Sequence, residues 1–136
     1  MTIEIKLHKE RKIQARELKR LYEDMGWWPE RTIVDIEKML NIGPAIGVWK
    51  DSRLVGFCRA ISDGVFRAYI EDVAVIEEHR KLGIGNRMVK ELMKELSDIS
   101  VVSLFCEEAL VDFYKKDRFK ETTQIVMHRK TKYRQQ

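Results

Sequence analysis

Two glycines stand two residues apart in the stretch HRKLGIGNRMV, between a basic pair and an apolar pattern with helical spacing. The backbone N–H groups of a helix's first turn lack intrahelical partners and carry a partial positive charge, so they favour a bound anion. Gly83 and Gly85 have no side chains to block a phosphate, and Arg80 and Lys81 add positive charge. The alternative is a tight strand-to-helix turn without a ligand, because short glycine motifs are weak evidence for a site.

The residues around these glycines exclude two common phosphate-binding motifs. A P-loop needs lysine and then serine or threonine after its last glycine, whereas Gly85 is followed by Asn86 and Arg87. A dinucleotide-binding fingerprint needs a third glycine, which is absent. The pattern therefore predicts an anion site without naming the anion.

The composition indicates one globular domain over residues 1–136. Hydrophobic residues make up 44% of the chain and charged residues 35%, enough of each for a core and a polar surface. The net charge of +4 favours anionic ligands without requiring nucleic acid, and charges of both signs mostly alternate along the chain, so a nucleic-acid partner is not expected. With no leader-like or membrane-spanning segment, a cytoplasmic protein without a membrane partner is expected. Cys58 and Cys106 lack metal-ligand spacing, so no metal site is predicted and both are expected as reduced thiols buried in strands.

Hydrophobic periodicity predicts a mixed α/β domain whose elements would position the glycine loop. Thr32 and Asp35 predict a capping box, Gly26 predicts a helix end, and the three central strands predict an antiparallel meander. The strand that follows the long amphipathic helix is expected to be buried. The expected order is a strand at 2–7, helices at 11–25 and 32–40, strands at 45–50, 54–62 and 67–76, a helix at 84–96, a strand at 101–106, a short helix at 107–117 and a strand at 122–129.

Several segments together resemble the GCN5-related N-acetyltransferases, the GNAT superfamily. RKLGIG matches the acyl-CoA loop of that family, LVGFCRAISDGVFRAYIEDVAV resembles its third and fourth strands, GIGNRMVKELMKEL resembles its central helix, and ALVDFYKKDRF resembles its late FYxxxGF segment. The likeness covers nearly the whole chain. It implies a mixed, mostly antiparallel sheet of about six or seven strands with four helices, in the order β-α-α-β-β-β-α-β-α-β.

The resemblance implies direct transfer of the acetyl group of acetyl-CoA, as co-substrate, to a primary amine in a ternary complex. The fourth and fifth strands would separate to admit the thioester, and the backbone of Val73 and Val75 would pair with the pantetheine arm. The oxyanion donor would be a backbone N–H near Val73 and Ala74. The resemblance places the pyrophosphate on the backbone of a loop that begins at Arg80 and Lys81 and continues through Leu82, Gly83, Ile84, Gly85 and Asn86.

Two roles in proton transfer follow from the same resemblance. Tyr114 matches the tyrosine that commonly protonates the leaving thiolate, and a phenol with a reference pKa of about 10 stays protonated at neutral pH. Its alternative role is that of a buried helix aromatic. Glu71 and Asp72 are candidates for the general base, and a strand would point these adjacent side chains to opposite faces. The alternative is a structural carboxylate with water as the base.

The acceptor site is expected between the first two helices and at the hairpin around Asp63, where Trp27 and Trp28 would suit an aromatic or apolar amine. The acceptor would be a small arylalkylamine-like or polyamine-like molecule, a protein lysine or an N-terminus. The alternative function is a non-catalytic regulator that binds acyl-CoA, and a homodimer fits the family.

Arg118 departs from the family pattern, which has glycine at this position. The position ends a helix and often needs positive φ.

Overall fold

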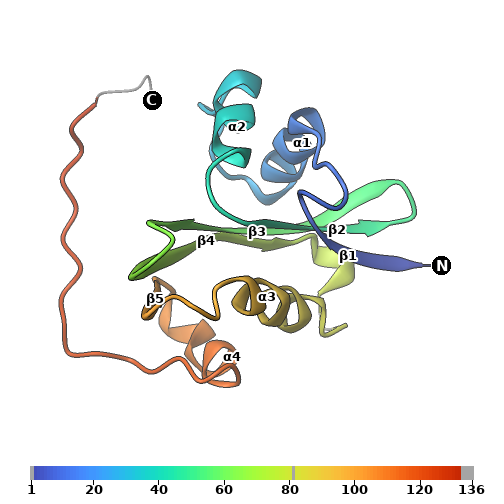
Figure 1. The fold of residues 1–136 in the computed structure, drawn as a ribbon. Helices are drawn as coiled ribbons and strands as arrows, with labels where there is room; N and C mark the ends of the chain where they lie inside the picture. Colours follow the sequence, from blue (N-terminus) through green and yellow to red (C-terminus); the bar gives the residue numbers. More distant parts are fainter. Residues whose placement is uncertain (1, 81, 133–136) are drawn as a thin grey trace. The chain divides into compact units, whose positions relative to one another are not determined.

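Five strands form one sheet in the order β1-β2-β3-β4-β5 in the computed structural model, which describes residues 2–80 and 82–132 (Figure 1). β1 to β4 are antiparallel neighbours, and β5 pairs parallel to β4. The chain up to Phe105 is one compact unit and the chain from Cys106 is a second. The elements are β1 Ile3–Leu7, α1 Ala15–Met25, α2 Ile33–Leu40, β2 Ala45–Lys50, β3 Arg53–Ser62, β4 Arg67–Val75, the 3-10 turn Glu77–His79, α3 Ile84–Glu95, β5 Val101–Leu104, the 3-10 turn Glu108–Leu110 and α4 Val111–Lys115.

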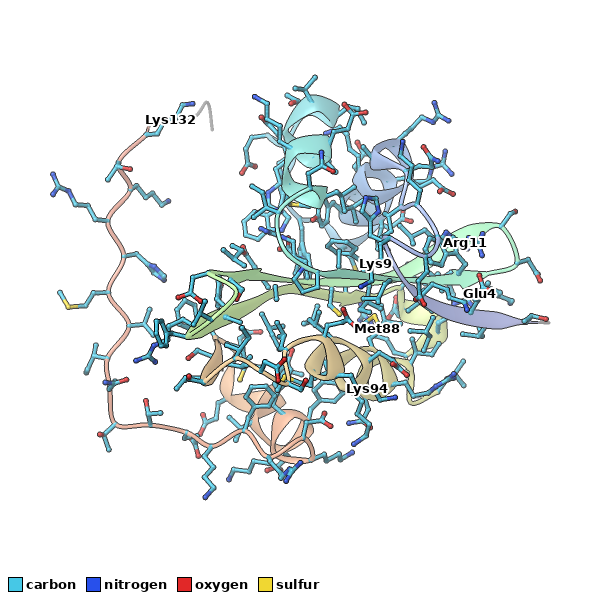
Figure 2. All side chains as sticks on the ribbon, in the orientation of Figure 1. Glu4, Lys9, Arg11, Met88, Lys94 and Lys132 are labelled. Carbon is cyan, nitrogen blue, oxygen red and sulfur yellow. The ribbon has the colours of Figure 1, made fainter. Side chains whose placement is uncertain are left out.

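Helices cover both faces of the sheet in the first unit, with α1 and α2 on one side and α3 on the other (Figure 1). The buried core lies in these two layers. Figure 2 shows Met88 on the side of α3 that faces the sheet, where it is completely buried. Within residues 2–80 and 82–132, no helix combines the length and apolar character that a membrane crossing requires.

Both N-terminal helices are bounded by the local signals expected from the sequence. A capping box opens α2, since the Thr32 hydroxyl accepts from the Asp35 amide and the Asp35 carboxylate accepts from the Thr32 amide. Gly26 closes α1 with φ of +74°, while its N–H and that of the next residue donate to Glu23 and Tyr22. This is a Schellman motif, which glycine favours because it adopts positive φ without a steric penalty.

The predicted three-stranded meander is confirmed, whereas the prediction of a buried strand at 101–106 is wrong in part. β5 is a strand, but it lies at the edge of the sheet, and its side chains are exposed or half-buried. An edge strand has one neighbour, and its apolar sequence alone does not reveal that position. Cys58 is buried in β3 as expected, but Cys106 follows the end of β5 and is exposed. The expectation of a buried strand cysteine is therefore wrong for Cys106.

The predicted strand over residues 122–129 is not a strand in the structure. This segment has no regular secondary structure, and its apolar side chains are exposed, with Ile125 at 84% and Met127 at 88%. Alternating apolar residues predict which face of a strand is buried, but a strand forms only when a neighbour completes its hydrogen bonds. The described residues therefore contain five strands instead of the expected six or seven.

Candidate functional site

β4 contains a β-bulge opposite β3, at the point where the two candidate carboxylates lie. Between two cross-strand pairs, Phe57 with Ala74 and Arg59 with Glu71, β3 has one residue and β4 has two. Asp72 lies in the bulge with φ of +59°, in the left-handed region. This conformation costs a residue other than glycine about 1–2 kcal/mol, and it persists where surrounding contacts fix it.

The bulge places Glu71 and Asp72 on the same side of the sheet, so the expectation that they point to opposite faces is wrong. Arg59 donates from Nε to Asp72 Oδ2 over 3.1 Å and from Nη2 to Glu71 Oε2 over 3.0 Å. One guanidinium group thus contacts both carboxylates. The physical reason is the bulge, because an extra residue with left-handed backbone breaks the two-residue alternation of a regular strand.

Asp72 collects four side-chain hydrogen bonds from three separate parts of the chain. The donors come from α1, from the segment between α1 and α2, and from β3. Tyr22 Oη donates to Oδ2 over 3.0 Å, Trp28 Nε1 to Oδ1 over 3.1 Å, Arg31 Nη1 to Oδ2 over 2.9 Å and Arg59 Nε to Oδ2 over 3.1 Å. We call the following side chains the Asp72 cluster: Tyr22, Trp28, Arg31, Arg59, Glu71 and Asp72.

The two carboxylates of the Asp72 cluster differ in their access to solvent. The side chain of Asp72 is 1% exposed and that of Glu71 is 21% exposed. Arg31 Nη2 lies 3.7 Å from Glu71 Oε1, so the same two arginines approach both acids. Two guanidinium groups then balance two carboxylates, which satisfies the requirement that buried charges be paired.

Tyr22 is held in its protonated form by this environment. Burial, followed by the negative charge of Asp72, raises the pKa of the Tyr22 phenol, while Arg31 and Arg59 act in the opposite direction. A phenol that keeps its proton can donate to the carboxylate at any physiological pH. Tyr22 therefore acts as a hydrogen-bond donor in the cluster, and its ring packs edge-on against Phe57 at 6.3 Å.

The expected acceptor residues Trp27 and Trp28 lie directly after α1. Their rings form an edge contact with centroids 6.5 Å apart, and Trp28 is 38% exposed. The guanidinium carbon of Arg31 lies 4.4 Å from the centroid of the Trp28 ring, within cation–π distance. The structure thus brings Trp28 into the Asp72 cluster, while its exposed surface faces solvent.

Asp63 shapes the turn between β3 and β4. Its Oδ1 accepts from three backbone N–H groups, those of Val65, Phe66 and Arg67, at 2.8, 2.8 and 3.1 Å. These bonds, with that of Val65 first, lower the pKa of the Asp63 carboxyl. Among the described residues, the side-chain hydrogen bonds of Asp63 all lie within the hairpin, so its role there is structural.

Gly83 leaves the N-terminus of α3 open. It is the N-cap residue, with φ of +75° and no side-chain cap, and the first turn contains no acidic residue. A β-carbon built on Gly83 would meet no atom within 4 Å. Around it, Leu82 is exposed, Ile84 is buried in the core, and Gly85 and Asn86 lie in the first turn of α3. Lys81, the other basic candidate, lies outside the described residues.

The edge of β4 that faces β5 is paired only over its first half. The parallel register ends where Ile70 meets Leu104, so Val73, Ala74 and Val75 lie beyond the end of that ladder. Arg80 Nε donates to the Val75 carbonyl over 2.9 Å, and its guanidinium approaches Met25 Sδ at 3.5 Å. Arg80, the predicted pyrophosphate ligand, therefore contacts the strand that is predicted to bind the pantetheine arm. Its guanidinium group occupies one lone pair of the Val75 carbonyl oxygen.

Tyr114 lies in α4, in the second compact unit. It is buried, and its ring forms edge contacts with Phe113 at 4.9 Å and Phe119 at 6.0 Å. The helix ends in a second Schellman motif, in which Arg118 N–H donates to Lys115 and Phe119 N–H donates to Tyr114. Arg118 has φ of +68°, so it adopts the left-handed conformation that the family glycine would provide.

Replacing Arg118 with glycine is therefore expected to stabilise the end of α4. The Arg118→Gly variant removes the steric cost of a side chain on left-handed backbone but loses more backbone entropy on folding. The net effect is an increase of about 0.5–1 kcal/mol in the free energy of unfolding. Chemical denaturation of the full chain measures it. The control is Lys116→Gly, where φ is −60° and glycine should destabilise. Equal destabilisation by both substitutions would contradict the assignment of strain to Arg118.

Sequence reasoning missed half of the Asp72 cluster, namely Tyr22, Arg31 and Arg59. Tyr22 and Arg31 were not assigned to a site, and Arg59 was treated as part of a strand. One signal was available, because Arg59 is a lone charge within the apolar run LVGFCRAIS and a buried charge requires a partner. The bulge that brings the partners together has no comparable sequence signal.

Comparisons with known proteins show the family and the fold of the chain. The family model described as Acetyltransferase (GNAT) family matches residues 8–118. An uncharacterized N-acetyltransferase ycf52 of Pyropia yezoensis is 35% identical over 119 residues, which cover 83% of this chain and 68% of that protein. GCN5-related N-acetyltransferase 2, chloroplastic, of Arabidopsis thaliana is 40% identical over 68 residues, which cover 48% of this chain and 26% of that protein. A probable acetyltransferase from meticillin-resistant Staphylococcus aureus shares the fold, with a TM-score of 0.81, 23% identity, and coverage of 97% of this chain and 100% of that structure.

Proposed function

The chain belongs to the GNAT family of acetyltransferases, and on this premise we propose that it transfers the acetyl group of acetyl-CoA to a primary amine by direct attack in a ternary complex. The proposal rests above all on the N-terminus of α3 at Gly83, which no side chain caps and where a β-carbon would meet no atom, because the backbone N–H groups of a helix's first turn suit a pyrophosphate. Its overall test is release of free thiol from acetyl-CoA that requires both the protein and an added amine.

The donor would occupy the loop and the free part of the β4 edge. The backbone of residues 82–86 would hold the pyrophosphate, and the backbone of Val73 and Val75 would align the pantetheine arm. When bound, acetyl-CoA supplies the reactive thioester. The N–H groups near Val73 and Ala74 would stabilise the developing oxyanion, since a bulge frees backbone groups from the ladder.

Of the two carboxylates, Glu71 is proposed as the general base. Asp72 already accepts hydrogen bonds from four side chains of the protein, and its own side chain is nearly inaccessible. Glu71 has the exposed surface that an incoming ammonium group requires. Tyr114 is proposed as the acid that protonates the leaving thiolate, because a phenol retains its proton at neutral pH.

The acceptor is proposed to contact Trp27 and Trp28 beside Glu71, as a small arylalkylamine-like or polyamine-like molecule or a protein amine. The exposed indole ring of Trp28 and the half-buried ring of Trp27 in contact with it support an apolar or aromatic body next to the amine. The second candidate is a non-catalytic regulator, which would bind acyl-CoA at the same loop without transfer. The cytoplasmic location, the single-domain assignment and a homodimer stay predictions.

Gly83→Val should raise the Kd of acetyl-CoA at least about 10-fold, which corresponds to about 1.4 kcal/mol. The new side chain would fill the open space in front of the α3 N-terminus and oppose the φ of +75°. Titration calorimetry measures the Kd. Gly64→Val is the matched control, because Gly64 has φ of +80° and equally open space but lies in the β3–β4 turn. Similar affinity in both variants would reject the loop as the donor site.

A further inference from the structure

Two residues with left-handed backbone are joined by a side-chain hydrogen bond. Trp28 has φ of +52° and Asp72 has φ of +59°, and Trp28 Nε1 donates to Asp72 Oδ1 over 3.1 Å. Each conformation costs about 1–2 kcal/mol for a side chain of this kind. Such strain persists when other contacts over-determine it, and here each strained residue is fixed partly by the other.

The segment that carries Trp28 is fixed at further points. Arg31 N–H donates to the Trp28 carbonyl over 3.1 Å, and Lys19 Nζ donates to the Arg31 carbonyl over 2.7 Å. The Arg31 side chain bonds Asp72 and covers the Trp28 ring. We call residues 27–31 the tryptophan segment. The side-chain hydrogen bonds of this segment to β4, from Trp28 and Arg31, converge on the carboxylate of Asp72, while Glu71 meets Arg31 only in a longer ion pair of 3.7 Å.

From this convergence we propose that Asp72 is a positioning residue, which holds the tryptophan segment against the β4 bulge and thereby sets the binding of the amine acceptor. The inference rests on the proposed function for the identity of the acceptor. In this role Asp72 neither transfers a proton nor contacts the substrate. Its action passes through Trp28 and Arg31, whereas Glu71 beside it remains the group that meets the amine.

The link is tested first in the absence of any substrate. In the full chain labelled with ¹⁵N, three tryptophans give three indole N–H signals, and Trp28→Phe identifies that of Trp28 by its loss. Asp72→Asn should shift the Trp28 signal and leave that of Trp49 in place, because asparagine tolerates left-handed backbone but replaces a charged acceptor. Asp51→Asn is the matched control, since Asp51 also has positive φ, at +56°, in the exposed turn after β2.

The second test separates positioning from mere stability. Asp72→Asn should raise the KM for the amine about 10-fold, the scale of replacing a charged hydrogen-bond acceptor by a neutral one, while the KM for acetyl-CoA changes less than about 2-fold. Trp28→Phe keeps an aromatic ring at a half-exposed position, so it should fold even if the Asp72 variant does not, and it should raise the amine KM similarly. Because both substitutions break one link, their effects should not add in the double variant.

Three outcomes would overturn the inference. These are an unshifted Trp28 indole signal in Asp72→Asn, an unchanged amine KM in folded Trp28→Phe, or additive effects in the double variant. A protein that transfers acetyl to no amine would refute the proposed function instead. The indole measurement would still decide whether Asp72 holds the tryptophan segment.

Discussion

Replacing Tyr114 with phenylalanine is expected to lower kcat by about 10²–10⁴-fold, the usual contribution of a positioned general acid. The leaving thiolate would then take its proton from water. The ring contacts of Tyr114 with Phe113 and Phe119 need only the aromatic ring, so phenylalanine should preserve α4. Steady-state kinetics with saturating acetyl-CoA and amine measure kcat.

Tyr69→Phe is the control for the loss of a phenol. Tyr69 lies on β4, where it packs against Phe105 at 4.9 Å, and it has no assigned role in proton transfer. Its variant should keep kcat within a few-fold of the wild type. If Tyr114→Phe also retained the wild-type kcat, Tyr114 would be a packing residue and the acid role would be lost.

Glu71→Gln is expected to lower kcat/KM at neutral pH by about 10²–10⁴-fold, because the amide cannot take the proton that the ammonium group must lose before its nitrogen attacks the thioester. Glutamine keeps an oxygen that can accept from Arg59 Nη2, so the Asp72 cluster should remain assembled. The deficit should shrink at high pH. An alkylamine with a reference pKa near 10.4 then reaches the site already neutral and needs no base.

Glu4→Gln provides the matched control for Glu71→Gln. Glu4 on β1 pairs with Arg11 at 2.8 Å, and both residues are labelled in Figure 2. Glu71 pairs with Arg59 in a similar way at 3.0 Å. Its variant should leave kcat/KM unchanged, as expected for an exposed ion pair of small energy. A Glu71→Gln enzyme with wild-type kcat/KM at neutral pH would assign the base to water and leave Glu71 a structural partner of Arg59.

The fold could be predicted wherever a local signal fixes an element. Glycine at the end of α1, the capping box of α2 and the strands of the central meander have signals in neighbouring residues, so the sequence predicts them correctly. The position of β5 at the sheet edge and the lack of strand pairing in residues 122–129 depend on neighbours far away in the chain. Periodicity carries no information about such neighbours.

The candidate site divides in the same way. Gly83 could be singled out from the sequence, because only a residue without a side chain leaves the N-terminus of a helix open to an anion. The joint contact of Glu71 and Asp72 with Arg59 could not, because it follows from a bulge and a left-handed aspartate. Predictions from the sequence assume that successive side chains of a strand alternate between its two faces, and one inserted residue moves a side chain to the other face.

Amine-dependent thiol release from acetyl-CoA tests the central claim most directly. The full chain is mixed with acetyl-CoA and a panel of arylalkylamines, polyamines and lysine peptides, and free thiol is measured with initial rates varied in both substrates. The account predicts release that needs both protein and amine, with intersecting reciprocal plots that indicate a ternary complex. Calorimetric binding of acetyl-CoA without thiol release from any amine would contradict it and would favour the acyl-CoA-binding regulator.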